Sequence, residues 1–329
     1  MSSLGITAPE IPASAQQWMP ENAETFAEGL MEILQDAISL LRPDIKEAAG
    51  ACLGVIAAVL IVSILQTFSG STKKTAELAG CVAISWLLLS STKSLIHLGS
   101  ETVSQLSEYG KLLLPVMAAA LAAQGGITGS AALYTGTAVF DAVLMTLIRN
   151  LMIPMIYLYL AMAAANGAVG ENSLKKLRDF LKWLMTWTLK IILYVFTGYM
   201  GITGVITGTT DAAALKATKL TISGMVPVVG GILSDASETI LVSAGVVKNA
   251  AGIYGILAIL ALCLEPFVKI GIHYLILKGT AAIAGIFAPK NISELIGDFS
   301  GAMGMLLAVT GSVCLLLLIS TVCFLKGVG

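Results

Sequence analysis

The sequence predicts an all-α fold, that of a polytopic integral membrane protein. Hydrophobic residues make up 57% of the 329 residues, charged residues make up only 12%, and the mean hydropathy is +0.89. A soluble domain carries about 25% charged residues. The chain also has charge-free windows that match the roughly 20 apolar residues of a spanning helix. Because ten-residue segments of alternating polarity are absent, helices are expected rather than a β-barrel. The windows are 48–72, 112–140, 150–170, 191–210 and 299–325.

Residues 1–47 are predicted to form an extracytoplasmic segment with an amphipathic helix, and residues 48–329 the helical transmembrane domain. Apolar residues recur every three or four positions from Phe26 to Leu41, and Pro43 is expected to end this helix. The stripe of carboxylates on another face either keeps the helix soluble while it packs on its own protein, or docks a partner outside the membrane. No apolar stretch typical of a signal peptide precedes the helix, so we expect a leader removed earlier or insertion by the first span. The stripe consists of Glu24, Glu28, Glu32 and Asp36.

The transmembrane domain is predicted to contain about seven spanning helices and two broken or re-entrant segments. The broken segments, 112–148 and 220–247, are apolar, but a pair of adjacent glycines interrupts each of them. The expected full spans are 48–68, 78–98, 150–168, 183–207, 249–264, 267–288 and 302–325.

The distribution of Lys and Arg predicts the orientation in the membrane. The densest basic cluster lies within 171–182, and Lys73, Lys74 and Lys326 mark two further basic positions. We therefore expect 171–182 and the C-terminus to be cytoplasmic, and the N-terminal segment and a loop near 99–111 to be external. This orientation requires each broken segment to cross the membrane an even number of times, as a re-entrant hairpin or as two short spans.

The glycine pairs are candidate transport positions. Irregular backbone at membrane depth persists only where protein or a water-filled cavity covers it, and paired broken helices point to the transport site of many transporters. The candidates on this argument are Gly125 and Gly126, and Pro227, Gly230 and Gly231. The alternative is that each glycine pair ends one short helix and begins another.

Ionisable residues within the apolar stretches are further candidates, because a charge in lipid is costly and should face protein or water. Asp141 and Arg149 lie eight residues apart, on roughly the same helix face, where they could pair as a packing element or serve transport. Asp235 follows the second glycine pair and either caps a helix or lines a polar passage. A third group shares one face if the helix continues through the intervening proline, and forms either a proton relay or an interfacial turn: Glu265, Lys269 and His273.

No catalytic constellation is visible in the sequence. The GxxxxGK[ST], HExxH and GxSxG patterns are absent, as are paired His or Cys ligands. We therefore expect no enzymatic activity, no cofactor and no metal, so that any ATP hydrolysis that drives movement belongs to another subunit. The net charge of −1 provides no long-range field that would favour nucleic acid.

Several segments resemble the stage III sporulation protein AE family. They are "LPVMAAALAAQGGITG" at 114–129, "NLMIPMIYLYLAM" at 150–162, "GTTDAAALKATKLTISGMVPVVGGILSDASETI" at 208–240 and "VVKNAAGIYG" at 246–255. The resemblance extends from about residue 20 to 325. It brings no established catalytic residues, and the matching block only nominates positions: Asp211, Lys219, Pro227, Gly230, Gly231, Asp235, Lys248 and Asn249.

The resemblance implies a multi-pass protein in the mother-cell-derived membrane that surrounds the forespore of an endospore-forming bacterium. Its implied partners are the other stage III sporulation A-operon proteins and stage II sporulation protein Q, in a channel complex that resembles specialised secretion systems and includes a separate ATPase. A homo-oligomer remains open. Two other functions also remain open: a self-sufficient secondary transporter of a small solute, and a membrane scaffold without a conduit of its own.

Overall fold

The structure is a computed structural model that describes residues 9–20, 26–68, 73–123, 127–169, 172–202 and 250–326. Within these ranges every regular element is a helix. The elements are α1 (Ala13–Gln16), α2 (Phe26–Phe68), α3 (Lys73–Ala123), α4 (Ile127–Leu147), the π-helix η2 (Ile148–Met152), α5 (Ile153–Val169), α6 (Asn172–Ile202), α9 (Ala250–Phe287) and α10 (Lys290–Lys326).

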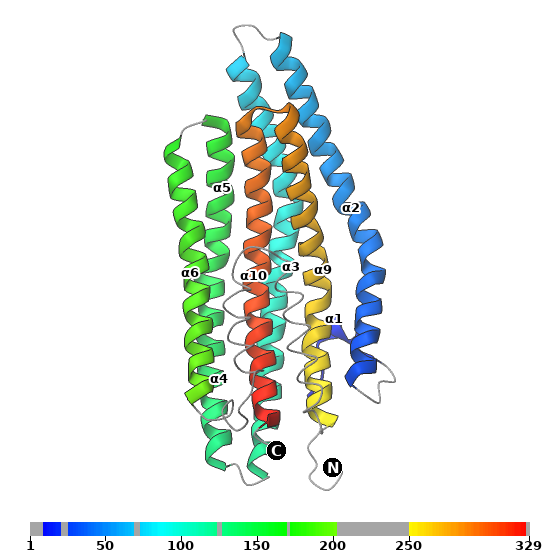
Figure 1. Cartoon of the computed structure of the whole chain (residues 1–329), viewed down its shortest axis with the longest axis vertical. Coiled ribbons are helices and arrows are strands. Elements are labelled where there is room, and N and C mark those ends of the chain that lie inside the picture. The colour runs from blue at the N-terminus through cyan, green and yellow to red at the C-terminus, as the bar shows by residue number, and fades with distance from the viewer. Residues whose placement is uncertain are drawn as a thin grey trace.

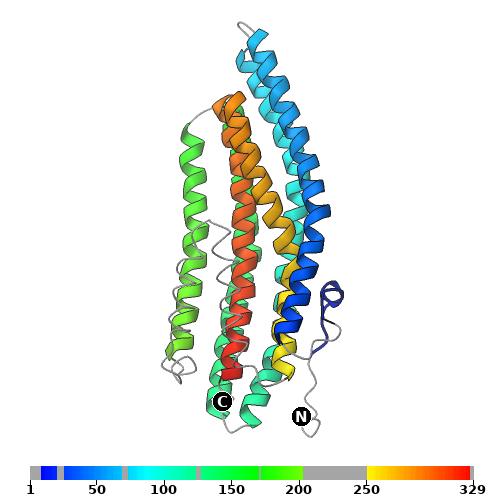
Figure 2. The ribbon, with the colours of Figure 1, turned by 45° about the vertical axis from the view of Figure 1, so that its right-hand side comes forward.

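The long helices form a bundle of roughly parallel rods (Figure 1). Helices α4, η2 and α5 continue one another and make a single rod, so the described chain contains six long rods. A second view shows the same arrangement and places the described N-terminal and C-terminal parts at one end of the bundle (Figure 2). The other end is called here the lysine-rich end. It contains the first turns of α3, α6 and α10, with Lys73, Lys74, Lys175, Lys176 and Lys290.

Six helices in the described part of the chain are long and apolar enough to cross a membrane, so the predicted all-α polytopic fold is confirmed. These candidate spans run over 36 residues or more in five cases and over 27 residues in Leu174–Met200. A helix rises about 1.5 Å per residue, so the 51 residues of α3 extend about 76 Å. The hydrocarbon core of a bilayer is only about 30 Å thick, so α3 must continue well outside it.

Prolines inside long helices change the predicted boundaries. The prediction that Pro43 ends the amphipathic helix is wrong, because α2 continues through it into the first predicted span. Pro266 likewise lies inside α9, which joins the predicted spans 249–264 and 267–288 into one rod. Pro115 lies inside α3. A proline removes one backbone donor, but neighbouring helices in a bundle can support the affected turn.

The stretch before the first glycine pair also differs from the prediction. The external loop expected near 99–111 is helical and belongs to α3, whose buried face there includes Leu106 and Tyr109. The stems 112–123 and 127–147 are therefore ends of two long rods rather than a short re-entrant hairpin. Residues 124–126 lie outside the described part of the chain.

The prediction that the segment 171–182 and the C-terminus lie on the same side of the membrane does not fit the bundle. α10 begins at the lysine-rich end beside α6 and ends, at Lys326, at the opposite end of the bundle (Figure 1). The predicted cytoplasmic segment 171–182 and the C-terminus therefore cannot lie on one side of a membrane that the bundle spans. The N-terminal part of the chain and the lysine-rich segments do lie at opposite ends of the bundle, as the predicted orientation requires (Figure 2).

The centre of the bundle lies along α10, which packs against α9, α3 and α5. Phe299 and Phe324 of α10 and Tyr109 of α3 are completely buried. α3 and α10 pack closely at Gly110, where an added Cβ would lie 2.6 Å from Leu317 Cδ2. This dense packing fixes the rods relative to one another.

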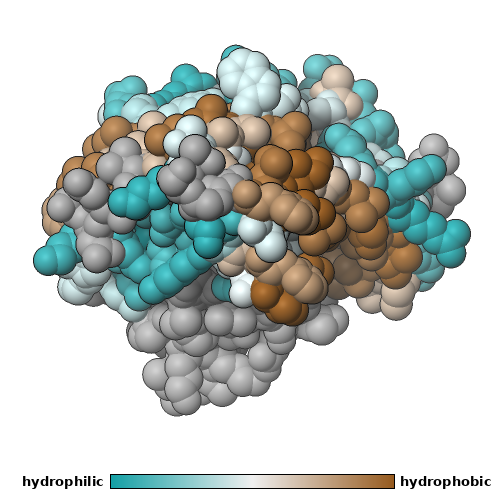
Figure 3. Space-filling view, turned by 90° about the horizontal axis from the view of Figure 1, so that it is seen from above, coloured by the Kyte–Doolittle hydropathy of each residue, from teal (hydrophilic) through white to brown (hydrophobic). Residues whose placement is uncertain are grey.

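Large apolar side chains remain on the outside of the bundle, most of all on α2 and also on α3 and α6. The view from above shows hydrophobic surface between hydrophilic areas (Figure 3). Leu53 and Ile61 of α2 and Trp86 of α3 are more than half exposed, at 65%, 58% and 77%. Contiguous apolar surface of this kind is typical of proteins that contact lipid or another protein.

Candidate functional site

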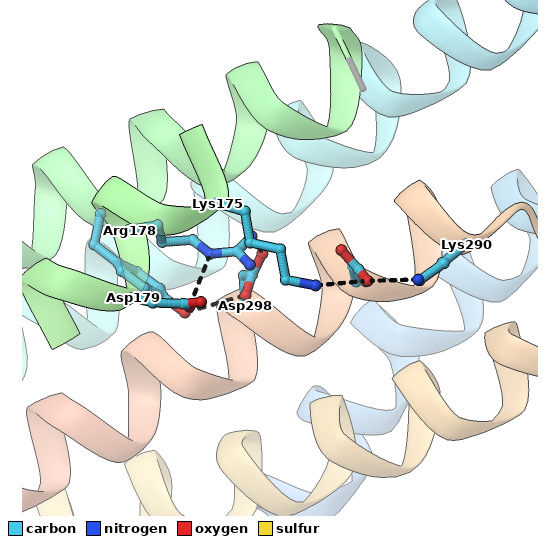
Figure 4. A network of polar contacts seen from close by, with 7 residues as sticks. Lys175, Arg178, Asp179, Lys290 and Asp298 are labelled. Atoms are coloured by element: carbon cyan, nitrogen blue, oxygen red, sulfur yellow. Dashed lines mark hydrogen bonds and ion pairs between the residues drawn. The ribbon is translucent and has the colours of Figure 1, made fainter. Parts of the chain in front are cut away.

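The most extensive polar contacts between rods lie at the lysine-rich end. α6 carries Lys175 and Arg178 one turn apart, and α10 carries Glu294 and Asp298 one turn apart. Residues three or four positions apart share a helix face, so each rod presents two charges to the other. Figure 4 shows the two rods side by side, with Lys175, Arg178 and Asp298 between them. These four residues, with Tyr159 of α5, are called here the ion-pair network.

Arg178 and Asp298 form the buried centre of this network. A guanidinium NH of Arg178 donates to Asp298 Oδ2, and the two side chains are only 4% and 14% exposed. The Tyr159 hydroxyl donates to the other carboxylate oxygen of Asp298 at 3.1 Å. Asp179 Oδ1 lies 3.9 Å from Arg178 Nε, which is too far for a hydrogen bond. Asp298 thus connects α10 to both α5 and α6.

The outer part of the network is more exposed. Lys175 Nζ donates to Glu294 Oε1 at 3.1 Å, and Lys290 Nζ lies 3.8 Å from the same oxygen. The Asn291 side-chain amide of α10 also donates to Glu77 Oε1 of α3, at 2.9 Å. These contacts extend the connection from α5 and α6, through α10, to α3.

A second polar cluster joins α3 to the α4–η2 rod. Ser107 Oγ of α3 donates to Asp141 Oδ2 at 2.8 Å, and both side chains are buried. Arg149, in the π-helix, donates to Ser104 Oγ of α3. The expected Asp141–Arg149 pair is not formed within the described residues. Eight helical residues span about 12 Å along the axis, so each side chain instead reaches a separate serine.

The third predicted group lies on α9 as its spacing suggested. Lys269 Nζ donates to Glu265 Oε1 at 2.7 Å, and His273 Nδ1 lies 2.9 Å from the Lys269 carbonyl oxygen. The buried Asp44 of α2 lies within electrostatic range of Lys269 and His273. This polar group thus marks a contact between α2 and α9.

The acidic stripe lies on the N-terminal half of α2. Glu28 and Glu32 are exposed and Asp36 is half-buried, whereas Phe26 and Ile33 pack into the core. Large apolar side chains are also exposed along the same half of the helix, namely Met31, Leu34, Ile38 and Ile45. The helix therefore packs one face on its own protein and still presents an acidic and apolar surface outward.

Many of the residues nominated from the sequence cannot be placed. They lie outside the described residues and comprise Glu24, Gly125, Gly126, Asp211, Lys219, Pro227, Gly230, Gly231, Asp235, Lys248 and Asn249. Their proposed roles stay predictions.

Sequence reasoning missed the centre of the ion-pair network. Arg178 entered only as an indicator of orientation, and Asp298 and Tyr159 were not singled out. One signal was available: Glu294 and Asp298 are one turn apart and directly precede the charge-free stretch 299–325. Their contact with α6 was not accessible, because 120 residues separate Arg178 from Asp298.

The ion-pair network is better suited to holding helices together than to catalysis. Lys175 and Arg178 of α6 pair with Glu294 and Asp298 of α10, and the Tyr159 hydroxyl of α5 donates to Asp298, although Arg178 Nε is buried without a hydrogen-bond partner among the described residues. No group of three or more His, Cys, Asp or Glu side chains in the described ranges is arranged to hold a metal ion.

Six long apolar rods fastened by buried polar contacts define a polytopic α-helical membrane protein. The family model for stage III sporulation protein AE matches residues 15–327, nearly the whole chain, and the chain therefore belongs to that family. Among curated proteins, it is similar to stage III sporulation protein AE of Bacillus subtilis (strain 168), with 24% identity over 197 residues. The aligned part covers 60% of this chain and 49% of that relative, so it spans about half of the relative's length. No solved structure matches the chain.

Proposed function

We propose that the chain is a non-enzymatic membrane subunit of a channel complex between mother cell and forespore, and that it supports transport into the forespore. The observation that carries this proposal is the family match over residues 15–327, which makes it a sporulation protein. Its location would be the mother-cell-derived membrane around the forespore. Its partners would be the other stage III sporulation A-operon proteins and stage II sporulation protein Q.

The bundle has features that suit a subunit held among other proteins. Its buried ion pair and close helix contacts make a fixed body, whereas α2 and α3 keep large apolar side chains on the surface. The lysine-rich end is the cytoplasmic side in this proposal, because Lys and Arg concentrate on that side of membrane proteins. The N-terminal half of α2 then lies on the external side, where soluble parts of partner proteins can reach it.

The acidic and apolar surface of α2 is the proposed docking surface. Carboxylates one turn apart repel one another by a few tenths of a kcal/mol per pair in an isolated helix. A basic partner surface offsets that repulsion, and the exposed Met31, Leu34 and Ile38 add apolar contact area. The alternative, that the carboxylates provide only solubility, predicts no effect of their reversal on partner binding.

Deletion of the gene in the native host tests the role in sporulation. We expect heat-resistant spores to fall by orders of magnitude while vegetative growth is unchanged, and the intact gene to restore them. Unchanged spore counts in the deletion strain would contradict the proposal.

A self-sufficient secondary transporter is the second candidate function. The observation in its favour is the carboxylate of Asp141, which is buried within a rod long enough to cross the membrane. Purified chain in sealed liposomes separates the two functions. A channel subunit that needs partners gives no solute flux alone, whereas a transporter gives saturable flux of its solute without any other protein.

A further inference from the structure

Asp141 of α4 has an unusual environment for a carboxylate. Its side chain is only 4% exposed, and its Oδ2 accepts a hydrogen bond from Ser107 at 2.8 Å. Its Oδ1 is buried and finds no hydrogen-bond partner among the described residues. A buried carboxylate oxygen without a partner is costly, so a partner from outside the chain is expected.

Thr137 has a second buried oxygen of the same kind, one turn before Asp141. The Thr137 side chain is completely buried, and its Oγ1 has no partner in the described part of the chain. Other helical threonines donate to the carbonyl oxygen one turn earlier, as Thr146, Thr197 and Thr310 do at 2.6–2.8 Å. Because positions i and i+4 share a helix face, the Thr137 hydroxyl and the free Asp141 oxygen lie on the same side of α4.

The nearby cations do not neutralise Asp141. Lys111 of α3 acts on it electrostatically, but the two form no ion pair in the ranges that the structure describes, and the Lys111 side chain is exposed. Arg149 donates to Ser104 instead. The buried group formed by Asp141, Thr137 and Ser107 therefore carries one unneutralised negative charge when Asp141 is ionised.

We propose that Asp141 and Thr137 bind one monovalent metal cation, Na⁺ or K⁺, between α3 and α4. Carboxylate and hydroxyl oxygens are hard ligands, which prefer hard cations. A single positive charge neutralises the group, whereas a divalent ion would leave a buried excess of one positive charge. Ser107 holds Asp141 through its second oxygen and so keeps Oδ1 directed to the cation. The π-helix begins seven residues after Asp141, and π-helical turns often occur beside functional sites.

The proposal is independent of the channel role, because a bound cation could support either a fixed subunit or a transporter. The test uses the purified full chain in detergent micelles. Its melting temperature is measured in NaCl, KCl and choline chloride at equal ionic strength. We expect Na⁺ or K⁺ to raise the melting temperature above the value in choline, with saturation, because a ligand bound only by the folded state stabilises it.

Two variants with matched controls assign the effect to this site. Asp141→Asn should abolish the response to the cation, whereas Glu108→Gln, at an exposed carboxylate of α3, should retain it. Thr137→Val, which keeps the side-chain shape, should raise the half-saturating cation concentration about tenfold, the effect of one lost contact to a charged group. Thr146→Val, at an exposed threonine of the same helix, should leave it unchanged.

Three outcomes would overturn the proposal. Equal melting temperatures of the wild-type protein in the three salts would exclude a bound metal cation, without reliance on any variant. Stabilisation by low pH with no response to Na⁺ or K⁺ would identify a proton as the occupant. A full cation response in Thr137→Val would place the cation elsewhere, and this variant carries the assignment if Asp141→Asn does not fold.

Discussion

Arg178 of α6 and Asp298 of α10 form a buried ion pair across 120 residues of sequence. The pair lies at the end of the bundle where Lys and Arg concentrate, and the Tyr159 hydroxyl brings α5 to the same carboxylate. Three rods are thus fixed at one point. Removal of one member leaves a buried charge without a counter-ion, which costs more than the net contribution of an intact pair.

Asp298→Asn should therefore destabilise the folded protein by about 3–5 kcal/mol. Lys290→Gln is the matched control on the same rod. Its ammonium lies 3.8 Å from Glu294 and its side chain is 84% exposed, so an effect below about 1 kcal/mol is expected. Denaturant unfolding of the purified proteins in detergent measures both values. Equal losses of unfolding free energy in the two variants would mean that the buried ion pair contributes no more to stability than an exposed one.

The contact between α4 and α6 offers a packing test. A Cβ at Gly136 would collide with the ring of Tyr199, whereas a Cβ at Gly198 meets nothing within 4 Å. Tyr199 is also held in place by its hydrogen bond to the Ala132 carbonyl oxygen, at 2.8 Å. Gly136→Ala should destabilise the protein by about 1–3 kcal/mol, as expected for overpacking.

Gly198→Ala serves as the control, and should be neutral or stabilising by up to about 1 kcal/mol, because alanine favours helix. Thermal unfolding, monitored by circular dichroism, measures the stability of both variants. If Gly136→Ala were as stable as Gly198→Ala, the close approach of α4 and α6 would be incorrect.

The orientation of the bundle can be tested by cysteine labelling. Lys74→Cys and Lys290→Cys lie at the lysine-rich end, and Lys326→Cys lies at the opposite end (Figure 1). We expect an impermeant maleimide applied outside intact cells to label Lys326→Cys and to leave the other two unlabelled. If the external maleimide labelled all three cysteines equally, the bundle could not span the membrane along its length.

The acidic surface of α2 predicts a salt-dependent interaction. Combined Glu28→Lys and Glu32→Lys substitutions should leave abundance in the membrane unchanged but lower the yield of co-purified partner proteins several-fold at low salt. The difference should shrink as salt rises, because exposed charges are screened within about 10 Å at 0.1 M and about 3 Å at 1 M ionic strength. Glu108→Lys reverses a charge at an exposed position of α3, away from this surface, and should have little effect. Unchanged partner yields at low salt would leave only solubility as the role of the stripe.

Composition and periodicity predicted the fold class, because an apolar chain with charge-free windows has few alternatives to a bundle of membrane helices. Helix boundaries were less predictable. Pro43 and Pro266 are strong helix-ending signals in isolated segments, yet α2 and α9 pass through both. Contacts between rods decide whether a helix continues through a proline, and those contacts are not local in the sequence.

The polar contacts were predictable only where they are local. The spacing of Glu265 and Lys269 predicted a shared helix face, and in the structure the two side chains are in contact. The Asp141–Arg149 pairing failed because each side chain found a serine on α3. The ion pair of Arg178 with Asp298 depends on how α6 and α10 pack, which no spacing within either helix encodes.

The central claim, that the chain works as a subunit of a membrane complex, is tested most directly by affinity purification from sporulating cells. A tagged full-length chain replaces the native copy, and the membranes are extracted with a mild detergent at low salt. The account predicts that the other stage III sporulation A-operon proteins and stage II sporulation protein Q co-purify in comparable amounts. A tagged chain that supports normal spore formation yet purifies without any of them would contradict the account.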